Sequence, residues 1–373
     1  MRAALKLLGV SVDYHDESKS AVVHGSGGKL NRAAKIEVGN SGTSIRFLTA
    51  MLGFAGGEFT LDGIERMRQR PIGPLVDALC SLGANVVAES SGGCPPVKIS
   101  SGRIVGGEVQ LSGDLSSQYL SGLLMAAPLA DHDVVLEIKG ELVSRPYVEM
   151  TCRVMDSFGV KVHREPGGNR FIVEAGQGYG GCEYHIEPDA SAASYFWATA
   201  AILGGTATVT GLNENSLQGD VGFVRCLEKM GCEVEFGGDS ISVSGKAKHG
   251  ANLDMADVSD TVQTLTSVAL FVNGPTTITN IAHNRVKETD RNGNLAIELR
   301  KFGVRVDEEP DGMTIHPGPL KGATIETYDD HRMAMSLALV GLRQPGVRIL
   351  DPGCVSKTFP NYFEELKNFV STD

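Results

Sequence analysis

The stretch HNRVKETDRN, from His283 to Asn292, concentrates charge of both signs between a predicted strand and a predicted helix. Five of its ten residues are charged: Arg285, Lys287, Glu288, Asp290 and Arg291. A carboxylate held among cations is a candidate proton donor or acceptor. If a helix begins near Val286, Lys287 and Arg291 share one face, and Glu288 can meet Arg291. The simpler interpretation is a solvated helix start with internal ion pairs.

Similar basic segments follow other predicted strands, and small or acidic residues open the predicted helices before them. The segments after these strands are RMRQRPIG, SRPY, NSLQGD, NRVKETDR and SKTFP, and the helix starts are GNSGTSIR, SSQ, DAS, SD and DDHR. Helix N-termini attract anions through their unpaired N–H groups. The cations expected beside them are Arg66, Arg68, Arg70, Arg145, Arg285, Lys287, Arg291, Arg332 and Lys357. We therefore expect a site for a multiply anionic small molecule.

Single motifs also have structural interpretations, and these stay open at the level of sequence. GNSGTS can be a tight turn, and SSQ can be an N-cap cluster. Asp260 in DVSDTV can be an ordinary N-cap. His331 can be a helix-start histidine bonded to Asp329 or Asp330.

Composition excludes several classes of function. With 34 basic and 45 acidic residues the net charge is −11, which argues against a nucleic-acid surface. No apolar run approaches the roughly 20 residues of a membrane span, and the opening MRAALKLLGV does not fit a signal peptide. The seven cysteines show neither CxxC pairs nor zinc spacing, so we expect a cytoplasmic protein without a metal.

A long repeat positions these segments. Five helical runs end in a glycine that precedes a β-type run, and these glycines are Gly9, Gly83, Gly159, Gly231 and Gly303. Their separations are 74, 76, 72 and 72 residues. Glycine reaches positive φ without a Cβ clash, so we expect it to end each helix. A period of this length suits a compact α/β unit.

The repeat also predicts the domains. We place a first domain at 1–186 and a second at 187–373, each an assembly of repeated α/β units. The chain begins inside the second helix of a unit, RAALKLLG. By the period, the first repeat is incomplete and lacks a helix and a strand, about 45 residues.

Together these motifs resemble the EPSP synthase (3-phosphoshikimate 1-carboxyvinyltransferase) family over essentially the whole chain. The matching segments are GNSGTSIRFL, RMRQRPIGPLVDAL, SSQYLSGLLMAAPL, LVSRPY, DASAASYF, NRVKETDR, YDDHRMAM and KTFPNYFEEL. The resemblance implies a two-domain inside-out α/β barrel of βαβαββ repeats. It also implies transfer of the carboxyvinyl group of phosphoenolpyruvate to the 5-hydroxyl of shikimate 3-phosphate by a monomer, without metal or cofactor.

The resemblance assigns roles to individual residues. Asp260 would take the hydroxyl proton, and Glu288 would protonate the methylene carbon. Shikimate 3-phosphate would contact Ser116, Ser117, Gln118, Ser144, Tyr147, Asp260, His283 and Lys287. Phosphoenolpyruvate would contact Asn40, Gly42, Arg70, Gln118, Arg291, Arg332 and Lys357. His283 stands where bacterial relatives often have an asparagine, and an imidazole can still donate or accept a hydrogen bond.

One departure and two alternatives accompany this assignment. The family's PGSKS…NR segment, which contacts both substrates, is absent, so we expect no measurable transfer by the 373 residues alone. The related UDP-N-acetylglucosamine carboxyvinyltransferases use a loop cysteine, whereas Cys94 here precedes PPV in a predicted hairpin. The other alternative is a non-catalytic homologue that binds an anion or a partner without turnover.

Overall fold

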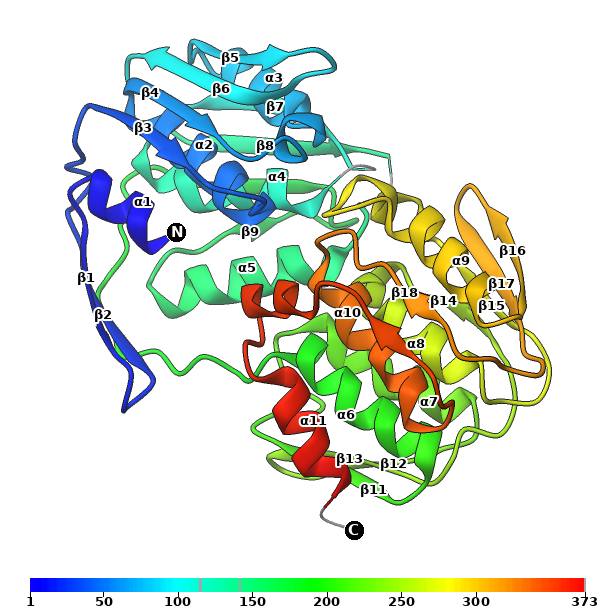
Figure 1. Cartoon of the computed structure of the whole chain (residues 1–373). Helices are drawn as coiled ribbons and strands as arrows, with labels where there is room; N and C mark the ends of the chain where they lie inside the picture. Colours follow the sequence, from blue (N-terminus) through cyan, green and yellow to red (C-terminus); the bar gives the residue numbers. More distant parts are fainter. Residues whose placement is uncertain (114–115, 141, 372–373) are drawn as a thin grey trace. The chain divides into compact units, whose positions relative to one another are not determined.

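The structure is a computed structural model that describes residues 1–113, 116–140 and 142–371 (Figure 1). The chain divides into two compact units, Met1–His185 and Ile186–Asp373. Each unit combines helices with mixed β-sheets, so the fold is mixed α/β. In the part of the chain that the structure describes, no helix is long and apolar enough to cross a membrane.

The first unit contains a two-stranded hairpin and two four-stranded sheets. Its helices are α1 (Arg2–Leu7), α2 (Gly42–Ala55), α3 (Gly73–Ser81), α4 (Ser117–Ala126) and α5 (Arg145–Ser157). The hairpin pairs β1 (Ser11–His15) with β2 (Ser20–His24). One sheet has the order β3 (Ala33–Glu37), β4 (Gly57–Asp62), β6 (Cys94–Ser101), β5 (Val86–Ser90). The other has the order β7 (Gly107–Ser112), β8 (Val134–Lys139), β10 (Arg170–Val173), β9 (His163–Arg164).

The second unit contains a three-stranded, a four-stranded and a two-stranded sheet among the described residues. Its helices are α6 (Ala190–Leu203), α7 (Phe223–Lys229), α8 (Val262–Ala269), α9 (Arg291–Lys301), α10 (His331–Ala338) and α11 (Tyr362–Val370). One sheet has the order β11 (Thr206–Thr210), β13 (Ser240–Ser244), β12 (Glu233–Phe236). A second has the order β14 (Asn252–Asp254), β15 (Thr276–Thr279), β17 (Gly312–His316), β16 (Arg305–Glu309). The last pairs β18 (Thr324–Ile325) with β19 (Arg348–Ile349).

The strands pair in the same way in equivalent places. β3 pairs in parallel with β4, β7 with β8, and β14 with β15. The second strand of each parallel pair also pairs antiparallel with the last strand of its repeat: β4 with β6, β8 with β10, and β15 with β17. This βαβαββ order places α2, α4 and α8 each after the first strand of a parallel pair, so these equivalent helices begin at equivalent points of their repeats.

The predicted helix-ending glycines are confirmed. Gly9, Gly83, Gly159, Gly231 and Gly303 have φ of +86°, +97°, +87°, +96° and +94°. Each follows a helix of the structure: α1, α3, α5, α7 or α9. A residue with a Cβ is strained at these angles, so the periodic glycines fix where each helix ends.

Three buried helices form the centre of the second unit. Their side chains meet through hydroxyl groups: Ser194 Oγ of α6 lies 3.1 Å from Thr264 Oγ1 of α8, which lies 3.2 Å from Ser336 Oγ of α10. These residues are 70 and 72 positions apart, the same period as the glycines. All three are fully buried. Small side chains in register bring the helices close, and their N-terminal ends therefore converge as well.

Candidate active site

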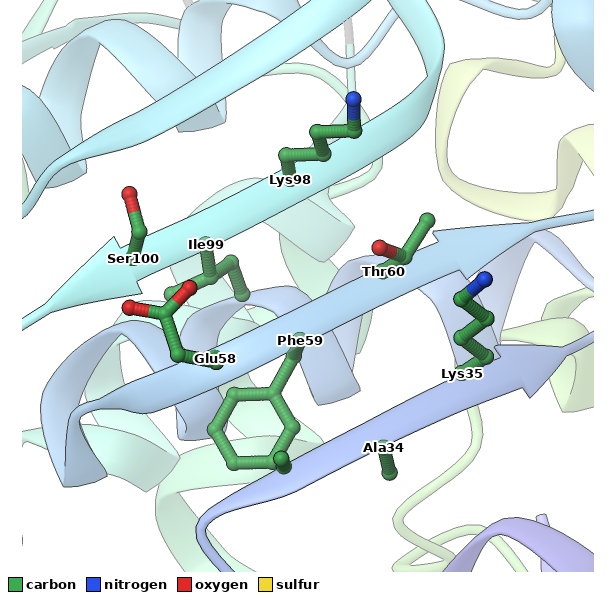
Figure 2. Close-up of a pocket in the computed structure, with 9 residues that line it drawn as sticks. Ala34, Lys35, Glu58, Phe59, Thr60, Lys98, Ile99 and Ser100 are labelled. Atoms are coloured by element: carbon green, nitrogen blue, oxygen red, sulfur yellow. The ribbon is translucent and has the colours of Figure 1, made fainter.

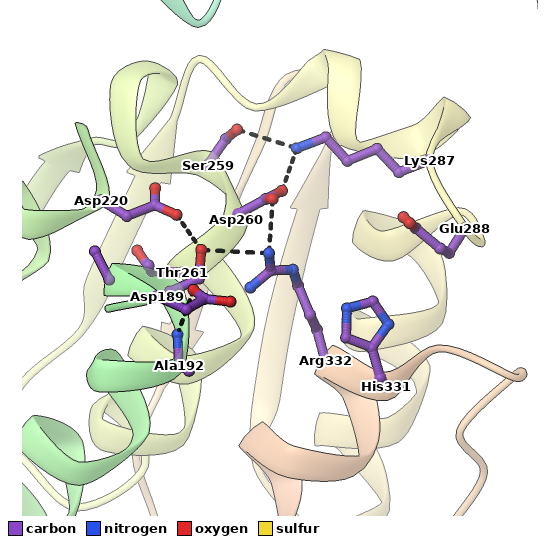
Figure 3. Close-up of polar contacts among 12 residues, drawn as sticks. Asp189, Ala192, Asp220, Ser259, Asp260, Thr261, Lys287, Glu288, His331 and Arg332 are labelled. Carbon is purple, nitrogen blue, oxygen red and sulfur yellow. Dashed lines mark hydrogen bonds and ion pairs between the residues drawn. The ribbon is translucent and has the colours of Figure 1, made fainter. Parts of the chain in front are cut away.

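The convergent N-terminal ends of α6, α8 and α10 carry the cluster around Asp260 (Figure 3). Asp260 lies in a 3-10 helix, Ala256–Thr261, that leads directly into α8. Thr261, not Asp260, occupies the N-cap position, and no side chain caps the helix there. The interpretation of Asp260 as an ordinary N-cap is therefore wrong, and its carboxylate is directed at cations instead.

Three cations surround the Asp260 carboxylate. Oδ1 lies 2.6 Å from Lys287 Nζ and 3.0 Å from Arg291 Nη1. Oδ2 lies 2.8 Å from Arg332 Nη2. Lys287 Nζ also donates to Ser259 Oγ at 3.2 Å. The sequence analysis placed all four charged residues in the site, and the structure brings them together.

The cations control the ionisation of Asp260. Burial alone would raise its pKa, but Arg332, Lys287 and Arg291 together hold the pKa of Asp260 well below its usual range. Burial lowers the pKa of Lys287, although Asp260 opposes that change. Asp260 is thus a carboxylate with a weak affinity for protons while all three cations remain on it.

Glu288 forms a second ion-pair cluster beside the first. Its Oε2 lies 2.9 Å from Arg291 Nη2, and its Oε1 lies 2.8 Å from Lys357 Nζ. Arg291 therefore bridges Glu288 and Asp260. Its remaining guanidinium nitrogen, Nε, lies 2.8 Å from Oδ2 of Asp330, a fully buried carboxylate. These contacts fix Arg291 from three sides and place both candidate proton-transfer groups on one guanidinium.

The predicted helix start near Val286 is wrong. A 3-10 helix spans Ala282–Val286, and α9 begins only at Arg291. Asp290 is the N-cap, and its Oδ1 accepts a hydrogen bond from the N–H of Gly293 at 3.0 Å. Because this cap stops the helix, Lys287 and Glu288 lie in the preceding segment, outside α9. Lys287 and Arg291 meet through Asp260 rather than along a helix face.

His283 lies in the 3-10 helix Ala282–Val286, just before Lys287. Burial, assisted by Lys287, lowers the pKa of His283 to about 4. The imidazole is therefore neutral at physiological pH and can donate one hydrogen bond and accept another. The neighbouring Asn284 is buried, and its side chain donates to the Ser259 carbonyl at 3.0 Å, which ties the basic segment to the loop before α8.

In the first unit, the start of α2 lies against Arg70. Arg70 Nη1 donates to the Asn40 carbonyl at 2.9 Å and to its Oδ1 at 3.1 Å. A Cβ on Gly42 would lie 2.5 Å from Arg70 Nη2 and 3.1 Å from Arg46 Nη1. Only glycine leaves room for both guanidinium groups here. The structure thus brings the predicted residues Asn40, Gly42 and Arg70 together.

The start of α4 lies next to the same guanidinium groups. Gln118 Oε1 accepts from Arg46 Nη1 at 2.6 Å, and Gln118 Nε2 donates to Thr43 Oγ1 at 3.1 Å. Ser116 caps α4 through its side chain, which accepts from the Gln118 N–H at 3.3 Å. The predicted N-cap role of SSQ is therefore confirmed, and Ser117 is buried in the first turn of α4.

Ser144 and Tyr147 lie at the start of α5. Ser144 is buried and holds the N-cap position in a left-handed conformation, with φ of +53° and ψ of 42°. The Tyr147 N–H donates to the Ser144 carbonyl at 3.1 Å. A non-glycine residue in this conformation is uncommon and occurs often at functional positions.

Four of the nine predicted cations have structural partners elsewhere. Arg68 pairs with Asp62 at 2.5 Å, and Arg66 donates to Gln69 at 3.3 Å. Arg145 donates to the Gly168 carbonyl at 3.1 Å. Arg285 pairs with Asp290 and Glu308 at 3.2 and 3.0 Å. For these four, a structural role accounts for the contacts described: ion pairs for Arg68 and Arg285, and hydrogen bonds to neutral groups for Arg66 and Arg145.

Sequence reasoning missed several residues that shape these sites. Asp330 and Arg46 stood inside the quoted motifs YDDHRMAM and GNSGTSIR, so their charge was the available signal. His331 Nδ1 lies 3.6 Å from Asp330, too far for the expected hydrogen bond. Ser191 and Asp220 also reach the cluster, but 29 residues separate them, and only the fold brings them together.

Two other features carry no chemistry of this kind. A shallow groove of about 500 Å³ crosses the outer face of β3, β4 and β6, lined by Lys35, Glu58, Thr60 and Lys98 among others (Figure 2). It includes none of the predicted site residues. Cys94, the candidate for the alternative chemistry, is buried at the start of β6, and burial raises its pKa. Across the described residues there is no His, Cys, Asp and Glu cluster that could hold a metal ion.

Comparisons with known proteins agree with one another. A sequence model of the family described as EPSP synthase (3-phosphoshikimate 1-carboxyvinyltransferase) matches residues 1–366. The 3-phosphoshikimate 1-carboxyvinyltransferase of Sulfurovum sp. is 47% identical over 375 residues, which cover 100% of this chain and 88% of that protein. The chloroplastic enzyme of Solanum lycopersicum is 47% identical, with coverage of 99% and 75%. A solved EPSP synthase from Acinetobacter baumannii superposes with a TM-score of 0.78 at 27% identity, with coverage of 98% and 86%.

Proposed function

Because the chain belongs to the EPSP synthase family, we propose that it transfers the carboxyvinyl group of phosphoenolpyruvate to the 5-hydroxyl of shikimate 3-phosphate and releases phosphate. This activity is that of a 3-phosphoshikimate 1-carboxyvinyltransferase (EC 2.5.1.19), a transferase of the shikimate pathway that leads to aromatic amino acids. The observation that carries the proposal is the arrangement of Lys287, Arg291 and Arg332 on Asp260, with Glu288 bound to the same Arg291.

The site residues divide between the substrates as follows. We propose that phosphoenolpyruvate contacts Arg291, Arg332 and Lys357 in the second unit and Asn40, Gly42, Arg70 and Gln118 in the first. Shikimate 3-phosphate contacts Ser116, Ser117, Gln118, Ser144, Tyr147, Asp260, His283 and Lys287. Guanidinium groups suit carboxylate and phosphate oxygens because their N–H donors are planar and paired.

Substrate binding would activate Asp260. In the unliganded arrangement three cations hold its pKa low, and a general base works best with a pKa near the operating pH. Anionic substrates compete for the same cations. When the phosphates and the carboxylate draw Lys287, Arg291 and Arg332 toward themselves, the pKa of Asp260 rises and its carboxylate can take the 5-hydroxyl proton.

The reaction then balances as an addition followed by an elimination. Glu288 gives a proton to the methylene carbon of phosphoenolpyruvate, and positive charge develops at the neighbouring carbon. The 5-hydroxyl oxygen bonds to that carbon as Asp260 takes its proton. Phosphate then leaves with the proton that Asp260 took from the hydroxyl, and the methyl group formed in the addition gives one proton back to Glu288. Lys357 and Arg291, both within 2.9 Å of Glu288, hold the carboxyl group in position.

We further propose that each unit follows the inside-out α/β barrel plan of the family, with parallel helices inside and sheets outside. The buried helices α6, α8 and α10 support this plan in the second unit. The protein would act as a monomer in the cytoplasm, without metal or cofactor. Sedimentation at several concentrations tests the oligomeric state.

Phosphate release tests the proposed function. The protein should release phosphate from phosphoenolpyruvate only when shikimate 3-phosphate is present. One enol ether product should form per phosphate. Equal release without shikimate 3-phosphate, or with UDP-N-acetylglucosamine in its place, would contradict the assigned acceptor.

A further inference from the structure

Asp220 is a buried carboxylate that reaches the active-site cluster, although the family resemblance assigns it no role. It lies in the 3-10 helix Gly219–Gly222, after the segment NSLQG, and is 3% exposed. Its Oδ2 accepts a hydrogen bond from the hydroxyl of Ser191, in the first turn of α6. Placing a carboxylate out of water is costly, so a buried one that contacts an active-site helix needs a reason.

Ser191 connects this carboxylate to Arg332. Ser191 is also buried, and its Oγ accepts a hydrogen bond from Arg332 Nη2 at 3.3 Å. The same Nη2 lies 2.8 Å from Asp260 Oδ2. The contacts therefore run from Asp220 through Ser191 and Arg332 to Asp260, and Figure 3 labels Asp220, Arg332 and Asp260 along this line. Arg332 is thus placed by two anchors, one of which is a neutral hydroxyl.

The carboxylate determines how that hydroxyl is oriented. An ionised carboxylate can only accept hydrogen bonds, whereas a hydroxyl has one donor and two acceptor lone pairs. With Asp220 ionised, the Ser191 hydrogen points to Asp220, and an oxygen lone pair remains for the guanidinium of Arg332. A protonated Asp220 can instead donate to Ser191, which occupies one lone pair of the hydroxyl and frees the Ser191 hydrogen to turn, so the lone pair that faces Arg332 is no longer held in place.

We propose that Asp220 and Ser191 are positioning residues that hold the Arg332 guanidinium in place for phosphoenolpyruvate. The inference rests on the proposed function of Arg332 and extends it to two residues that contact no substrate. Asp220 would act only through Ser191, and Ser191 only through Arg332.

A purely structural role is the competing explanation. Asp220 would then only tie its loop to α6. Gln218 already makes that connection, because its Oε1 accepts from the Ala190 N–H at 2.8 Å and its Nε2 donates to the Pro188 carbonyl at 2.6 Å. The loop therefore has an attachment that does not involve Ser191 or Arg332.

The charged groups facing Asp220 make its role dependent on pH. Burial, and secondarily Asp260, raises the pKa of Asp220 to about 6, against the opposing effects of Arg332, Ser191 and Lys287. The carboxylate is therefore ionised above about pH 6 and protonated below it. The positioning of Arg332 should weaken as the pH falls through this value.

The experiment compares Ser191→Ala with Ser194→Ala, the same substitution one turn later on α6. Ser194 is fully buried; its hydroxyl donates to the Ser191 carbonyl at 2.6 Å and lies 3.1 Å from Thr264 Oγ1, and it has no described contact to Arg332 or to the Ser191 side chain. Ser191→Ala should raise the KM for phosphoenolpyruvate about three- to tenfold, the range for losing one hydrogen bond of ordinary strength. The Kd for shikimate 3-phosphate alone, measured by calorimetry, should change less than twofold. Ser194→Ala should leave both values within twofold.

Two variants of Asp220 complete the test. Asp220→Ala should behave like Ser191→Ala, whereas the amide oxygen of Asp220→Asn can still accept from Ser191 and should restore most of the affinity. The ratio of the KM values for phosphoenolpyruvate of Asp220→Asn and wild type should also change between pH 5.5 and pH 8. Only in the wild type does the side chain of residue 220 become protonated at low pH. The ionisation of phosphoenolpyruvate changes the KM of both proteins equally, so it cancels in the ratio.

The outcomes separate the inference from the function it rests on. A wild-type protein that does not use phosphoenolpyruvate would overturn both. Normal turnover with equal KM in Ser191→Ala and Ser194→Ala would overturn the inference alone, and so would an equal loss of affinity for both substrates. If Asp220→Ala fails to fold, Ser191→Ala and Asp220→Asn still show whether Ser191 and Asp220 position Arg332.

Discussion

Lys287 Nζ lies 2.6 Å from Asp260 Oδ1, so the cation proposed to bind the substrate phosphate is paired with the carboxylate proposed as the base. The pair is partly shielded from solvent, with side-chain exposures of 22% and 21%. We therefore expect an anion bound to Lys287 to weaken its ion pair with Asp260. Such coupling would keep the proposed base at a low pKa until the substrate arrives.

Replacing the base tests this coupling. Asp260→Asn should lower turnover by roughly 10²- to 10⁴-fold, the usual range for a lost general base. Affinity for shikimate 3-phosphate should stay the same or increase, because three cations lose their internal counter-ion. Steady-state kinetics and calorimetry measure the two effects. Near-normal turnover would return Asp260 to a structural role.

Replacing the proposed acid should affect turnover more than binding. Glu288→Gln keeps the shape of the side chain but holds no transferable proton, so we expect turnover to fall by roughly 10²- to 10⁴-fold. The matched control is Glu233→Gln on β12, an exposed residue distant from the cluster in the sheet β11-β13-β12. Comparable rates in both variants would remove Glu288 from the mechanism.

Arg332→Ala should weaken the affinity for phosphoenolpyruvate about 10- to 100-fold, which corresponds to hydrogen bonds to a charged group worth roughly 1.5–3 kcal/mol. It should also raise the pKa of Asp260, because Arg332 is the cation that lowers it most. The control Arg348→Ala removes an exposed arginine of β19. Unchanged KM for phosphoenolpyruvate in Arg332→Ala would mean that another cation holds this substrate.

Gly42→Ala should displace the guanidinium groups of Arg70 and Arg46. The added Cβ would lie 2.5 Å from Arg70 Nη2, so the guanidinium must move. We expect the KM for phosphoenolpyruvate to rise several-fold, with little effect on the Kd for shikimate 3-phosphate. Gly102→Ala adds a Cβ where no atom lies within 4 Å and serves as the control. Equal KM values in the two variants would exclude Arg70 from binding.

His283 should make stability depend on pH. Its pKa is about 4 in the folded protein against 6.5 ordinarily, so the unfolded chain binds more protons between these values. The free energy of unfolding therefore falls as the pH drops below 6.5, by about 2 kcal/mol at pH 5. His283→Asn should remove this loss, whereas His185→Asn, an exposed residue, should not. Urea unfolding at pH 7.5 and pH 5 measures the difference, and identical losses in both variants would contradict it.

The repeat was the part of the fold most accessible from sequence. Glycines 9, 83, 159, 231 and 303 predicted where five helices end, because positive φ is a local requirement that glycine meets alone. The same local reasoning misplaced the start of α9. It counted the spacing of Lys287 and Arg291 and overlooked Asp290 as the cap that delays the helix.

The candidate site was predicted only as far as charge and motif allow. Asp260, Lys287, Arg291 and Arg332 stood out by type, and the structure brings them together. The part played by Asp330 was not predictable, because 39 residues separate it from Arg291 and only the packing of α10 near α9 makes them partners. The same holds for Ser191 and Asp220.

Carrying out the reaction in D2O tests the proposed proton transfers most directly. If Glu288 protonates the methylene carbon and elimination returns one proton from the methyl group, deuterium must enter the vinyl methylene of the product. Mass spectrometry should find this label in product made by the wild type, and phosphate should appear in equal amount. Glu288→Gln should form neither labelled product nor phosphate at a comparable rate. Product that forms at an ordinary rate without deuterium would contradict the addition and elimination at Glu288 and Asp260.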